Sequence, residues 1–299
     1  MELRQLRHFV AVVDCANLSR AAERVAISQP ALTRSIKTLE DLLGVELIER
    51  KPRGVTPTEA GLALYRHAQV VLNAAQRLTR EVRELEKGAA GTVHVGVGAM
   101  FATHVTARVA RDLADAHPRL ALVINDGFWE DLLRRMQDGR IDLIFSHFPQ
   151  ATAGADLVLE PLMTVRSVVV AGRGHALAAR RSLEVADLVT QRWVIADQPH
   201  SQDAFESYFS VAGLPAPRDI YRTNSLNLML ALVAGGGFLS QLPVHLLDSV
   251  PVQRDVRVLP LASGAIERQA GLIYRRGAES RRAVEHVLDA FRSAAKEAC

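Results

Sequence analysis

A hydrophobic repeat divides this chain into parts with different patterns. Within the stretch 58–88, which contains no proline, apolar residues recur at alternating spacings of four and three. This repeat is typical of a coiled-coil helix. Such a helix would span roughly 45 Å and could not bury its own apolar stripe. The members of the stripe are Leu64, Ala68, Val71, Ala75, Leu78, Val82 and Leu85.

The stripe needs a second helix to cover it. The same helix of a second copy is the most economical partner, because one sequence then supplies both surfaces. Packing on the C-terminal part of the same chain is the alternative. Residues 58–88 are therefore predicted to be a linker helix that dimerises, with Thr58 as its N-cap.

Two shorter helical patterns precede it, between residues 17 and 44. Asn17 can cap the first, in which Ala21 and Ala22 let another helix approach closely. Ser28 can cap the second, and Pro30 lies in its first turn, where a missing N–H costs nothing. Gly44 ends it. The inward stripe of the second helix is expected to be Leu32, Ile36, Leu39 and Leu43.

The outward face of the second helix is polar and partly basic. Glutamine can pair with adenine, arginine with guanine, and threonine with a thymine methyl group or a phosphate. Two helices joined by a short turn in this way predict a helix-turn-helix, and the basic stretch ERKPRGVTP that follows resembles a wing. A solvated helix face would explain an isolated helix, but not the whole order of elements. The candidate DNA-binding residues are Ser28, Gln29, Pro30, Thr33, Arg34, Lys37, Arg50, Lys51 and Arg53.

Charge and cysteine usage agree with this interpretation. Residues 1–90 hold 14 Lys and Arg against 11 Asp and Glu, so the whole net charge of +3 lies there; the rest holds 22 of each. Cys15 and Cys299 lie at opposite ends of the chain, which argues against a disulfide framework or a zinc site. Neither a long apolar run nor a secretory h-region is visible, so a cytoplasmic location without membrane contact is expected.

Residues 91–299 alternate short β-branched runs with helical stretches. This pattern predicts an α/β region with mostly parallel sheets. There are too many strands for one small sheet, so two Rossmann-like subdomains are expected, the first over 91–164 plus 269–299 and the second over 165–268. The predicted strands are Val93–Val97, Ala121–Asn125, Asp142–Phe145, Ser167–Ala171, Trp193–Ala196, Ile220–Thr223, Phe238–Leu242 and Gly271–Tyr274.

Catalytic and metal motifs are missing from this region. GVGAMF lacks the third glycine of a dinucleotide fingerprint, and the sequence has neither a P-loop nor a GxSxG elbow. The spacing of His94, His104 and His117 is not that of a metal site. We therefore expect a binding cleft and not an active site, and no cofactor or metal.

Ligands of open α/β sheets bind beyond the carboxyl ends of strands. Helix N-termini near these ends would suit a carboxylate or another anion. Each such residue also has a simpler interpretation as a turn or cap. The candidate effector-binding residues are Gly98, Ala99, Met100, Phe101, Thr103, Ser146, His147, Gln198, Pro199, Asn224 and Ser240.

The stretch LSRAAERVAISQPALTRSIKTLEDLLGVELIERKPRGVTPTEAG resembles the N-terminal pattern of LysR-type transcriptional regulators nearly position by position. HPRLALVINDG, DGRIDLIF and AGGGFLSQLP match the family more weakly. The resemblance implies a winged helix-turn-helix over 1–57, an antiparallel pairing of linker helices, and an effector-binding domain over 91–299 that resembles periplasmic solute-binding proteins. It also implies Gln29, Pro30, Thr33 and Arg34 at the major groove and Arg53 at the minor groove.

One position departs from the family pattern. Members often carry a hydroxyl residue just after the first strand of the regulatory domain, where an effector carboxylate is held. Here that position is Gly98, followed by three apolar residues. The effector is therefore expected to be larger, more apolar or differently held than a simple diacid, with His147 and Asn224 supplying polar contacts. An organic anion or an aromatic acid is the expected class.

The predicted function is a regulator that binds promoter DNA as a dimer, or as the homotetramer expected of the family, and responds to a small organic effector. Contact with RNA polymerase is compatible with it. One alternative is a small-molecule binding protein whose N-terminal helices contact another protein. Another is an enzyme fused to a DNA-binding segment.

Overall fold

The computed structural model of the chain describes residues 1–51, 54–86, 91–103, 105–148, 156–247, 254–261 and 266–297. The chain divides into two compact units, Met1–Ala89 with Arg134–Arg140, and Ala90–Leu133 with Ile141–Cys299. No helix in the described ranges has both the length and the apolar character that crossing a membrane requires.

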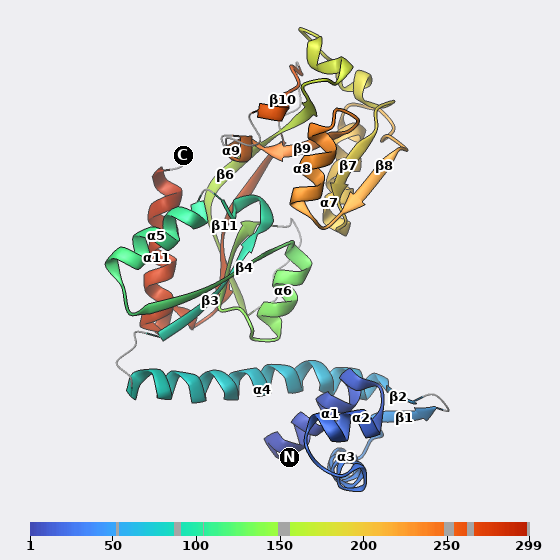
Figure 1. Cartoon of the computed structure of the whole chain (residues 1–299), viewed down its shortest axis with the longest axis vertical. Helices are drawn as coiled ribbons and strands as arrows, with labels where there is room; N and C mark the ends of the chain where they lie inside the picture. The colour runs from blue at the N-terminus through green and yellow to red at the C-terminus, as the bar shows by residue number, and fades with distance from the viewer. Residues whose placement is uncertain are drawn as a thin grey trace. The chain divides into compact units, whose positions relative to one another are not determined.

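The N-terminal unit begins with a helical domain that carries a two-stranded hairpin, followed by one long helix (Figure 1). Its elements are α1 (Leu3–Cys15), α2 (Leu18–Arg24), α3 (Gln29–Leu43), β1 (Ile48–Lys51), β2 (Gly54–Pro57) and α4 (Glu59–Glu86).

The predicted caps of these helices are confirmed. The Asn17 side chain accepts from the Arg20 amide at 3.0 Å, and the Ser28 hydroxyl accepts from the Ala31 amide at 3.4 Å. The Thr58 hydroxyl accepts from the Gly61 amide at 3.0 Å. Each bond satisfies an amide that the first turn of a helix leaves without a partner.

The core of this domain lies between α1, α2 and α3. Leu32, Ile36 and Leu39 are buried as predicted, but Leu43 is 41% exposed, so its placement in the inward stripe was wrong. The last turn of α3 extends beyond the helices that cover its middle. The other buried apolar side chains of the cluster are Phe9, Ala11, Val12, Ala21, Ala22, Leu47 and Val55.

The hairpin is held against the end of α1 by one close contact. Ala16, in the left-handed conformation at the end of α1, accepts a hydrogen bond from the Val55 amide at 3.0 Å. Gly54 has a φ of +138°, and a Cβ there would lie 2.4 Å from the Ala16 carbonyl oxygen. Only glycine fits this position, which fixes where the hairpin leaves the helical domain.

The second unit is built on one mixed sheet with the strand order β4-β3-β5-β11-β6-β9-β7-β8, and with β10 paired to β6. The strands are β3 (Gly91–Gly98), β4 (Leu120–Gly127), β5 (Leu143–His147), β6 (Leu157–Gly172), β7 (Trp193–Ala196), β8 (Ile220–Thr223), β9 (Leu239–Pro243), β10 (Val256–Val258) and β11 (Ile266–Arg275). The helices are α5 (Val105–Ala116), α6 (Trp129–Gln137), α7 (Pro199–Val211), α8 (Leu226–Ala234), α9 (Val244–Leu247) and α11 (Arg282–Glu297), with short 3-10 turns η1 (Ala99–Phe101), η2 (Ala176–Ala179), η3 (Val185–Leu188) and η4 (Ala278–Ser280).

Every predicted strand is present, but the sheet is less parallel than predicted. β3 runs parallel to β4 and β5, and β7 runs parallel to β8 and β9. The long strands β6 and β11 pair antiparallel with each other and with their outer neighbours. The first half of β6 was missed because Pro161 and its half-exposed pattern hide a strand. The short β10 was missed as well.

These two long strands serve two separate cores. Around β3 and β5, α5 and α11 pack together on one face and bury Val95, Phe145 and Phe291 (Figure 1). Around β7, α7 covers one face through Phe205, and α8 covers the other through Met229. Since β6 and β11 run through both regions, the two halves share one sheet.

A bidentate ion pair ties α11 to β6. Arg292 Nε and Nη2 donate to the two Glu160 carboxylate oxygens at 2.7 and 2.8 Å, and the Tyr274 hydroxyl donates at 3.1 Å. The Arg292 hydrogen bonds, more than any other contact, hold the pKa of Glu160 below the ordinary value of 4.5. A carboxylate in this position stabilises the fold as long as it stays ionised.

A pH prediction follows from Glu160. Because its folded pKa is lowered, its contribution is complete above pH 4.5 and is lost as the pH falls through the folded pKa. We expect Glu160→Gln to lower the free energy of unfolding by about 1–2 kcal/mol at pH 7, a value reduced for partial exposure. Urea unfolding should show this difference shrinking below pH 4.5. Glu267→Gln, at an exposed position of β11, is the control that should change little; a pH-independent loss in Glu160→Gln would contradict the argument.

Candidate functional site

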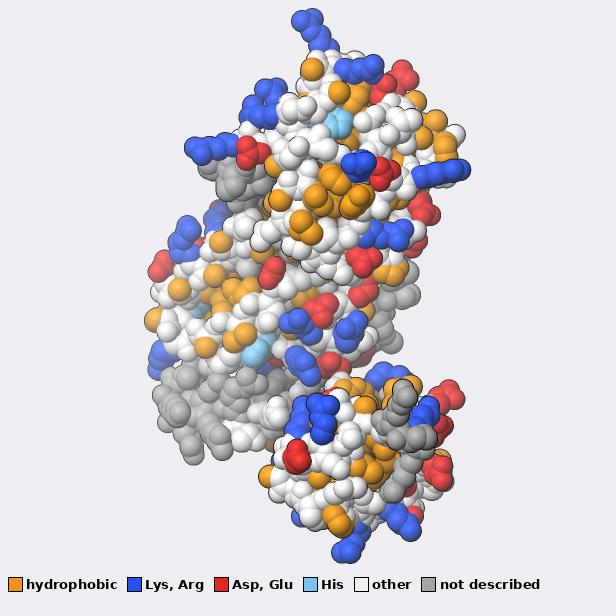
Figure 2. All heavy atoms as spheres, turned by 45° about the vertical axis from the view of Figure 1, so that its right-hand side comes forward, with side chains coloured by type: hydrophobic (Ala, Val, Ile, Leu, Met, Phe, Trp, Pro, Cys, Tyr) orange, Lys and Arg blue, Asp and Glu red, His pale blue; other side chains and the backbone are white. Residues whose placement is uncertain are grey.

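The recognition surface lies on the outward side of α3. Ser28, Gln29, Pro30, Arg34 and Lys37 are exposed, and Thr33 is half-buried beside them. Figure 2 shows Lys and Arg side chains projecting from the surface of this domain. The Gln29 amide oxygen accepts from the Ser19 hydroxyl at 3.1 Å, so α2 orients the first side chain of α3. The six predicted residues thus share one accessible face, which has donors and acceptors suited to base edges and phosphates.

The hairpin of β1 and β2 supplies the wing. Lys51 pairs with Gly54 across it, and the Lys51 ammonium lies 3.8 Å from the Glu49 carboxylate. The backbone of Arg50 is in β1; Arg53 and the side chain of Arg50 lie outside the described residues. Glu40, which the sequence did not single out, accepts from the Leu47 and Ile48 amides at 2.8 and 3.3 Å. These two hydrogen bonds attach the start of the wing to α3.

The apolar stripe of α4 falls into two parts. Leu64 packs on the core of the helical domain, and Ala68 is buried. Further along, Val71, Leu78 and Val82 are 42%, 64% and 51% exposed in the single chain. Ala75 is half-buried, and the side chain of Leu85 lies outside the described part. The stripe is therefore covered at Leu64 and Ala68 and largely uncovered from Val71 to Val82.

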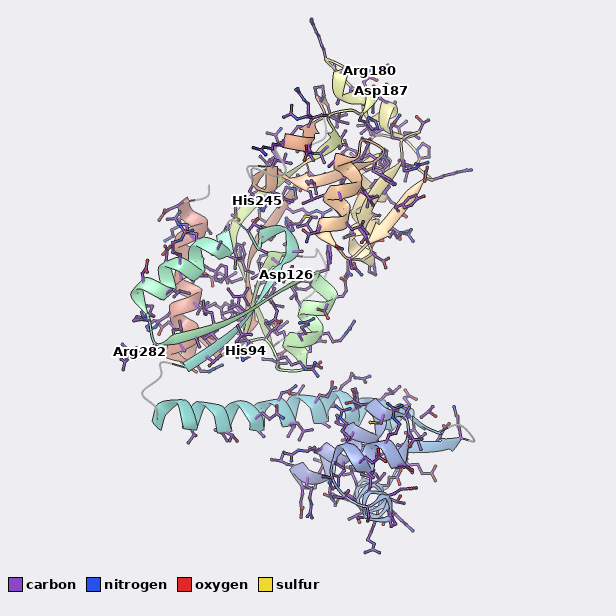
Figure 3. The ribbon with its side chains drawn as sticks, in the orientation of Figure 1. His94, Asp126, Arg180, Asp187, His245 and Arg282 are labelled. Atoms are coloured by element: carbon purple, nitrogen blue, oxygen red, sulfur yellow. The ribbon has the colours of Figure 1, made fainter. Side chains whose placement is uncertain are left out.

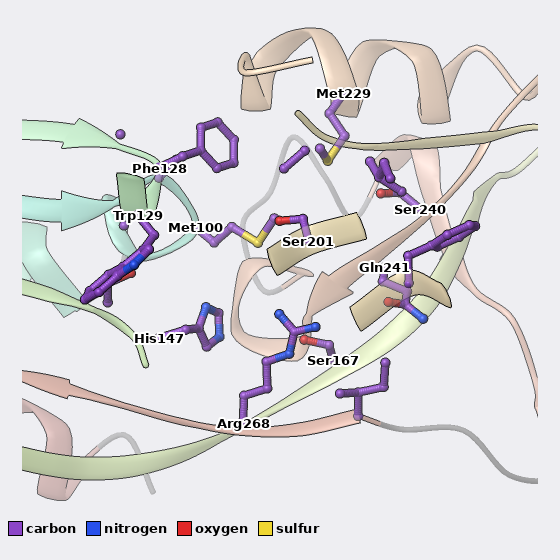
Figure 4. Close-up of a pocket in the computed structure, with 18 residues that line it drawn as sticks. Met100, Phe128, Trp129, His147, Ser167, Ser201, Met229, Ser240, Gln241 and Arg268 are labelled. Carbon is purple, nitrogen blue, oxygen red and sulfur yellow. The ribbon is translucent and has the colours of Figure 1, made fainter. Parts of the chain in front are cut away.

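A cavity of about 110 Å³ opens in the second unit at the carboxyl ends of several strands (Figure 4). It draws on both halves of the shared sheet, because β3 and β5 contribute from one half and β7 and β9 from the other. Its lining residues are Gly98, Ala99, Met100, Gly127, Phe128, Trp129, Ser146, His147, Ser167, Ile195, Ala196, Ser201, Phe205, Met229, Ser240, Gln241, Ile266 and Arg268.

About half of the predicted effector residues line this cavity. Gly98, Ala99, Met100, Ser146, His147 and Ser240 do so. Phe101 is buried behind it, and Thr103, Pro199 and Asn224 are exposed elsewhere. The Gln198 side-chain amide donates to the Asn224 side chain at 3.1 Å, so these two residues bind each other outside the lining. Asn224, which was predicted to supply a polar contact, thus lies outside the lining of this cavity.

The space beside Gly98, where a side chain would lie, is filled by Ser146 at the end of the neighbouring strand β5. A Cβ at Gly98 would lie 2.5 Å from the Ser146 hydroxyl oxygen. The hydroxyl group missing after β3 is thus supplied nearby by Ser146 of β5, and a residue larger than glycine would displace it. The Ser240 hydroxyl, by contrast, donates to the Val194 carbonyl at 2.9 Å and is committed to the fold.

The most consequential lining residue is one that the sequence did not reveal. Arg268 of β11 points its guanidinium into the cavity (Figure 4), and burial lowers its pKa. Gln241 of β9 has a buried side-chain nitrogen that lacks a hydrogen-bond partner among the described residues. Arg268 lies near the start of β11, before the predicted strand Gly271–Tyr274, and Gln241 follows the predicted residue Ser240 within β9.

The cavity loop is connected to the opposite half of the sheet. His245 lies on α9 (Figure 3). It is hydrogen-bonded to the Met100 carbonyl at 2.8 Å and stacks on Phe101, with ring centroids 4.9 Å apart. The Phe101 ring also contacts the rings of His147 and Phe145, with centroids 4.7 and 5.2 Å away. Phe101 is therefore not part of the cavity lining; it packs between residues of the two halves of the sheet, next to the cavity.

Known proteins match the chain over nearly its whole length. Residues 3–62 match the family "Bacterial regulatory helix-turn-helix protein, lysR family", and residues 86–296 match "LysR substrate binding domain". An SDS degradation transcriptional activation protein of Pseudomonas sp. (strain ATCC 19151) is 31% identical over 92% of this chain and 90% of the relative. The DNA-binding transcriptional dual regulator OxyR of Escherichia coli K12 is 26% identical over 98% and 95%.

Solved structures agree with these matches. A full-length OxyR variant from Pseudomonas aeruginosa has a TM-score of 0.64 and 26% identity, covering 98% of this chain and 95% of that one. CbnR, a LysR family transcriptional regulator, has a TM-score of 0.70 at 22% identity, over 97% and 99%, and supports the fold alone. A helix-turn-helix with a wing, a long helix and a two-core α/β domain are thus found together in one architecture. The chain belongs to the LysR family of transcriptional regulators.

Proposed function

We propose that this regulator binds promoter DNA as a dimer through α3 and the wing, and that a small organic molecule in the cavity modulates the binding. The observation that supports it best is the exposed polar face from Gln29 to Lys37 at the capped start of α3. A dimer brings two such faces to two half-sites, which one recognition helix alone could not read with useful specificity. Association of dimers into a tetramer, as well as contact with RNA polymerase, extends this proposal.

The effector response would follow from differential affinity. A ligand that binds one arrangement of the two sheet halves better shifts the population toward it. The cavity takes residues from both halves, and the His245–Met100 bond joins them. A ligand in this cavity would therefore contact both halves of the sheet.

Peroxide sensing by a cavity thiol is a poor fit to this chain. Several relatives are hydrogen peroxide-inducible genes activators. The thiolate is the side chain that peroxide oxidises most readily. Here the two cysteines are Cys15 and Cys299, and the cavity lining contains neither. A reversibly bound effector is the better proposal. A cavity of about 110 Å³ also favours a smaller effector than the larger one that Gly98 suggests.

Salt dependence separates DNA binding from the alternative in which the N-terminal helices bind a protein. Neutralising phosphates releases counterions, so DNA affinity should fall steeply between 50 and 200 mM salt, by roughly 10³-fold or more for six or more phosphate contacts. Fluorescence anisotropy with DNA from upstream of the gene measures it. An affinity for this DNA that is too weak to measure at 50 mM salt would favour the alternative.

A further inference from the structure

We infer that the cavity holds a small organic monoanion, with the Arg268 guanidinium and the Gln241 amide binding the anionic group and the methionine and aromatic side chains enclosing its apolar part. This inference names the ligand class of the proposed effector site. It rests on the proposed function only for the effect of that ligand on DNA binding. The class of ligand follows from charge, hydrogen bonding and volume.

The charge of the lining is one-sided. Among the described lining residues there is no Asp or Glu, and the Arg268 guanidinium has neither an ion pair nor a hydrogen bond within the described chain. An arginine stays protonated even where burial lowers its pKa. A buried charge without a counterion is costly, and an anionic ligand would remove that cost.

Hydrogen bonding points to the same ligand. Gln241 Nε2 is buried and has no acceptor among the described residues. Ser167 and Ser201 bring hydroxyl groups to the same lining. A carboxylate offers several acceptor sites, so it could satisfy the guanidinium and the amide together. A cation would be repelled, and a neutral amide would leave the charge uncompensated.

The volume of the cavity and its apolar lining residues limit the size and polarity of the uncharged part of the ligand. Met100, Phe128, Trp129, Ile195 and Met229 supply apolar and polarisable surface. The cavity, about 110 Å³, is smaller than the ~150 Å³ cavity that holds benzene. One arginine and a short apolar wall therefore fit a short-chain carboxylate better than a diacid or a large aromatic acid.

Butyrate and butyramide form the test pair, because they match in size and differ in charge. Trp129 lines the cavity, and the other tryptophan, Trp193, is fully buried in a core, so tryptophan fluorescence of the full chain can report binding. We expect butyrate to bind at least roughly tenfold more tightly than butyramide, in line with a charge-assisted hydrogen bond. Arg268→Gln should abolish this preference. Arg218→Gln, at an exposed position of the same domain, should retain it.

Equal binding of butyrate and butyramide, or a preference that survives Arg268→Gln, would overturn the inference. So would failure of acetate, butyrate and benzoate alike to bind. If Arg268→Gln does not fold, as judged by its melting temperature, Gln241→Leu takes its place and should weaken butyrate binding several-fold. Promoter affinity, measured without ligand, separates the two proposals: its absence in the wild-type chain would end the proposed function and leave the anion site standing.

Discussion

Leu78→Asp should convert the proposed dimer to a monomer. Leu78 is 64% exposed in the single chain, in the uncovered part of the stripe on α4. If the stripe packs on the same helix of a second copy, an aspartate there becomes a buried charge without a partner, which costs about 3–5 kcal/mol. The dimer dissociation constant should then rise roughly 10²–10³-fold or more. Sedimentation velocity across a range of protein concentrations measures the change.

Gln76→Asp is the matched control, since it adds the same charge to an exposed position on the other side of α4. It should leave the dimer intact. A Leu78→Asp variant that remains dimeric would show that the stripe is covered in some other way, for example by the C-terminal part of the chain. Loss of the dimer should also weaken promoter binding, because each copy then reads one half-site alone.

Arg34→Ala should weaken binding to the promoter and relax its sequence preference. Arg34 is exposed on α3, between Thr33 and the buried Ile36. An arginine that reads a guanine edge contributes about 1–3 kcal/mol. Promoter affinity should therefore fall roughly 5- to 150-fold, and affinity for unrelated DNA should fall less.

Fluorescence anisotropy with both DNAs measures these affinities. Arg218→Ala, which removes an exposed arginine from the regulatory domain, should change neither. Lys37→Ala offers a contrast, because a phosphate contact should lower both affinities alike and reduce the salt slope by about one. An Arg34→Ala variant with unchanged promoter affinity would remove Arg34 from the recognition surface.

The N-terminal domain could be predicted closely because its signals are local. Asn17, Ser28 and Thr58 cap helices through bonds to amides only three residues away. The outward face of α3 follows from helical periodicity alone. Leu43 and Leu64 were less predictable, since their burial depends on how far neighbouring helices reach and not on their spacing in the sequence.

The cavity was only partly predictable, because its residues are brought together by pairing between segments that lie far apart in the sequence. Residues at the ends of β3 and β5 could be found because parallel strands end at the same edge of a sheet. Arg268 comes from β11, which reaches the site because it pairs antiparallel with β5 and β6. Gln241 comes from β9, next to the predicted residue Ser240. Pairing between distant segments is not encoded in local periodicity. In the sequence, Arg268 stands in the polar run ERQ before the apolar part of β11, so nothing local marks it as a residue of the cavity.

The most direct test of the central claim is the affinity of the full-length protein for DNA upstream of its own gene, compared with unrelated DNA of equal length at physiological salt. We predict a preference of roughly 10³-fold or more for the upstream DNA, as sequence-specific readers show. Equal affinity for the two DNAs would contradict the assignment of α3 and the wing as a sequence-reading surface.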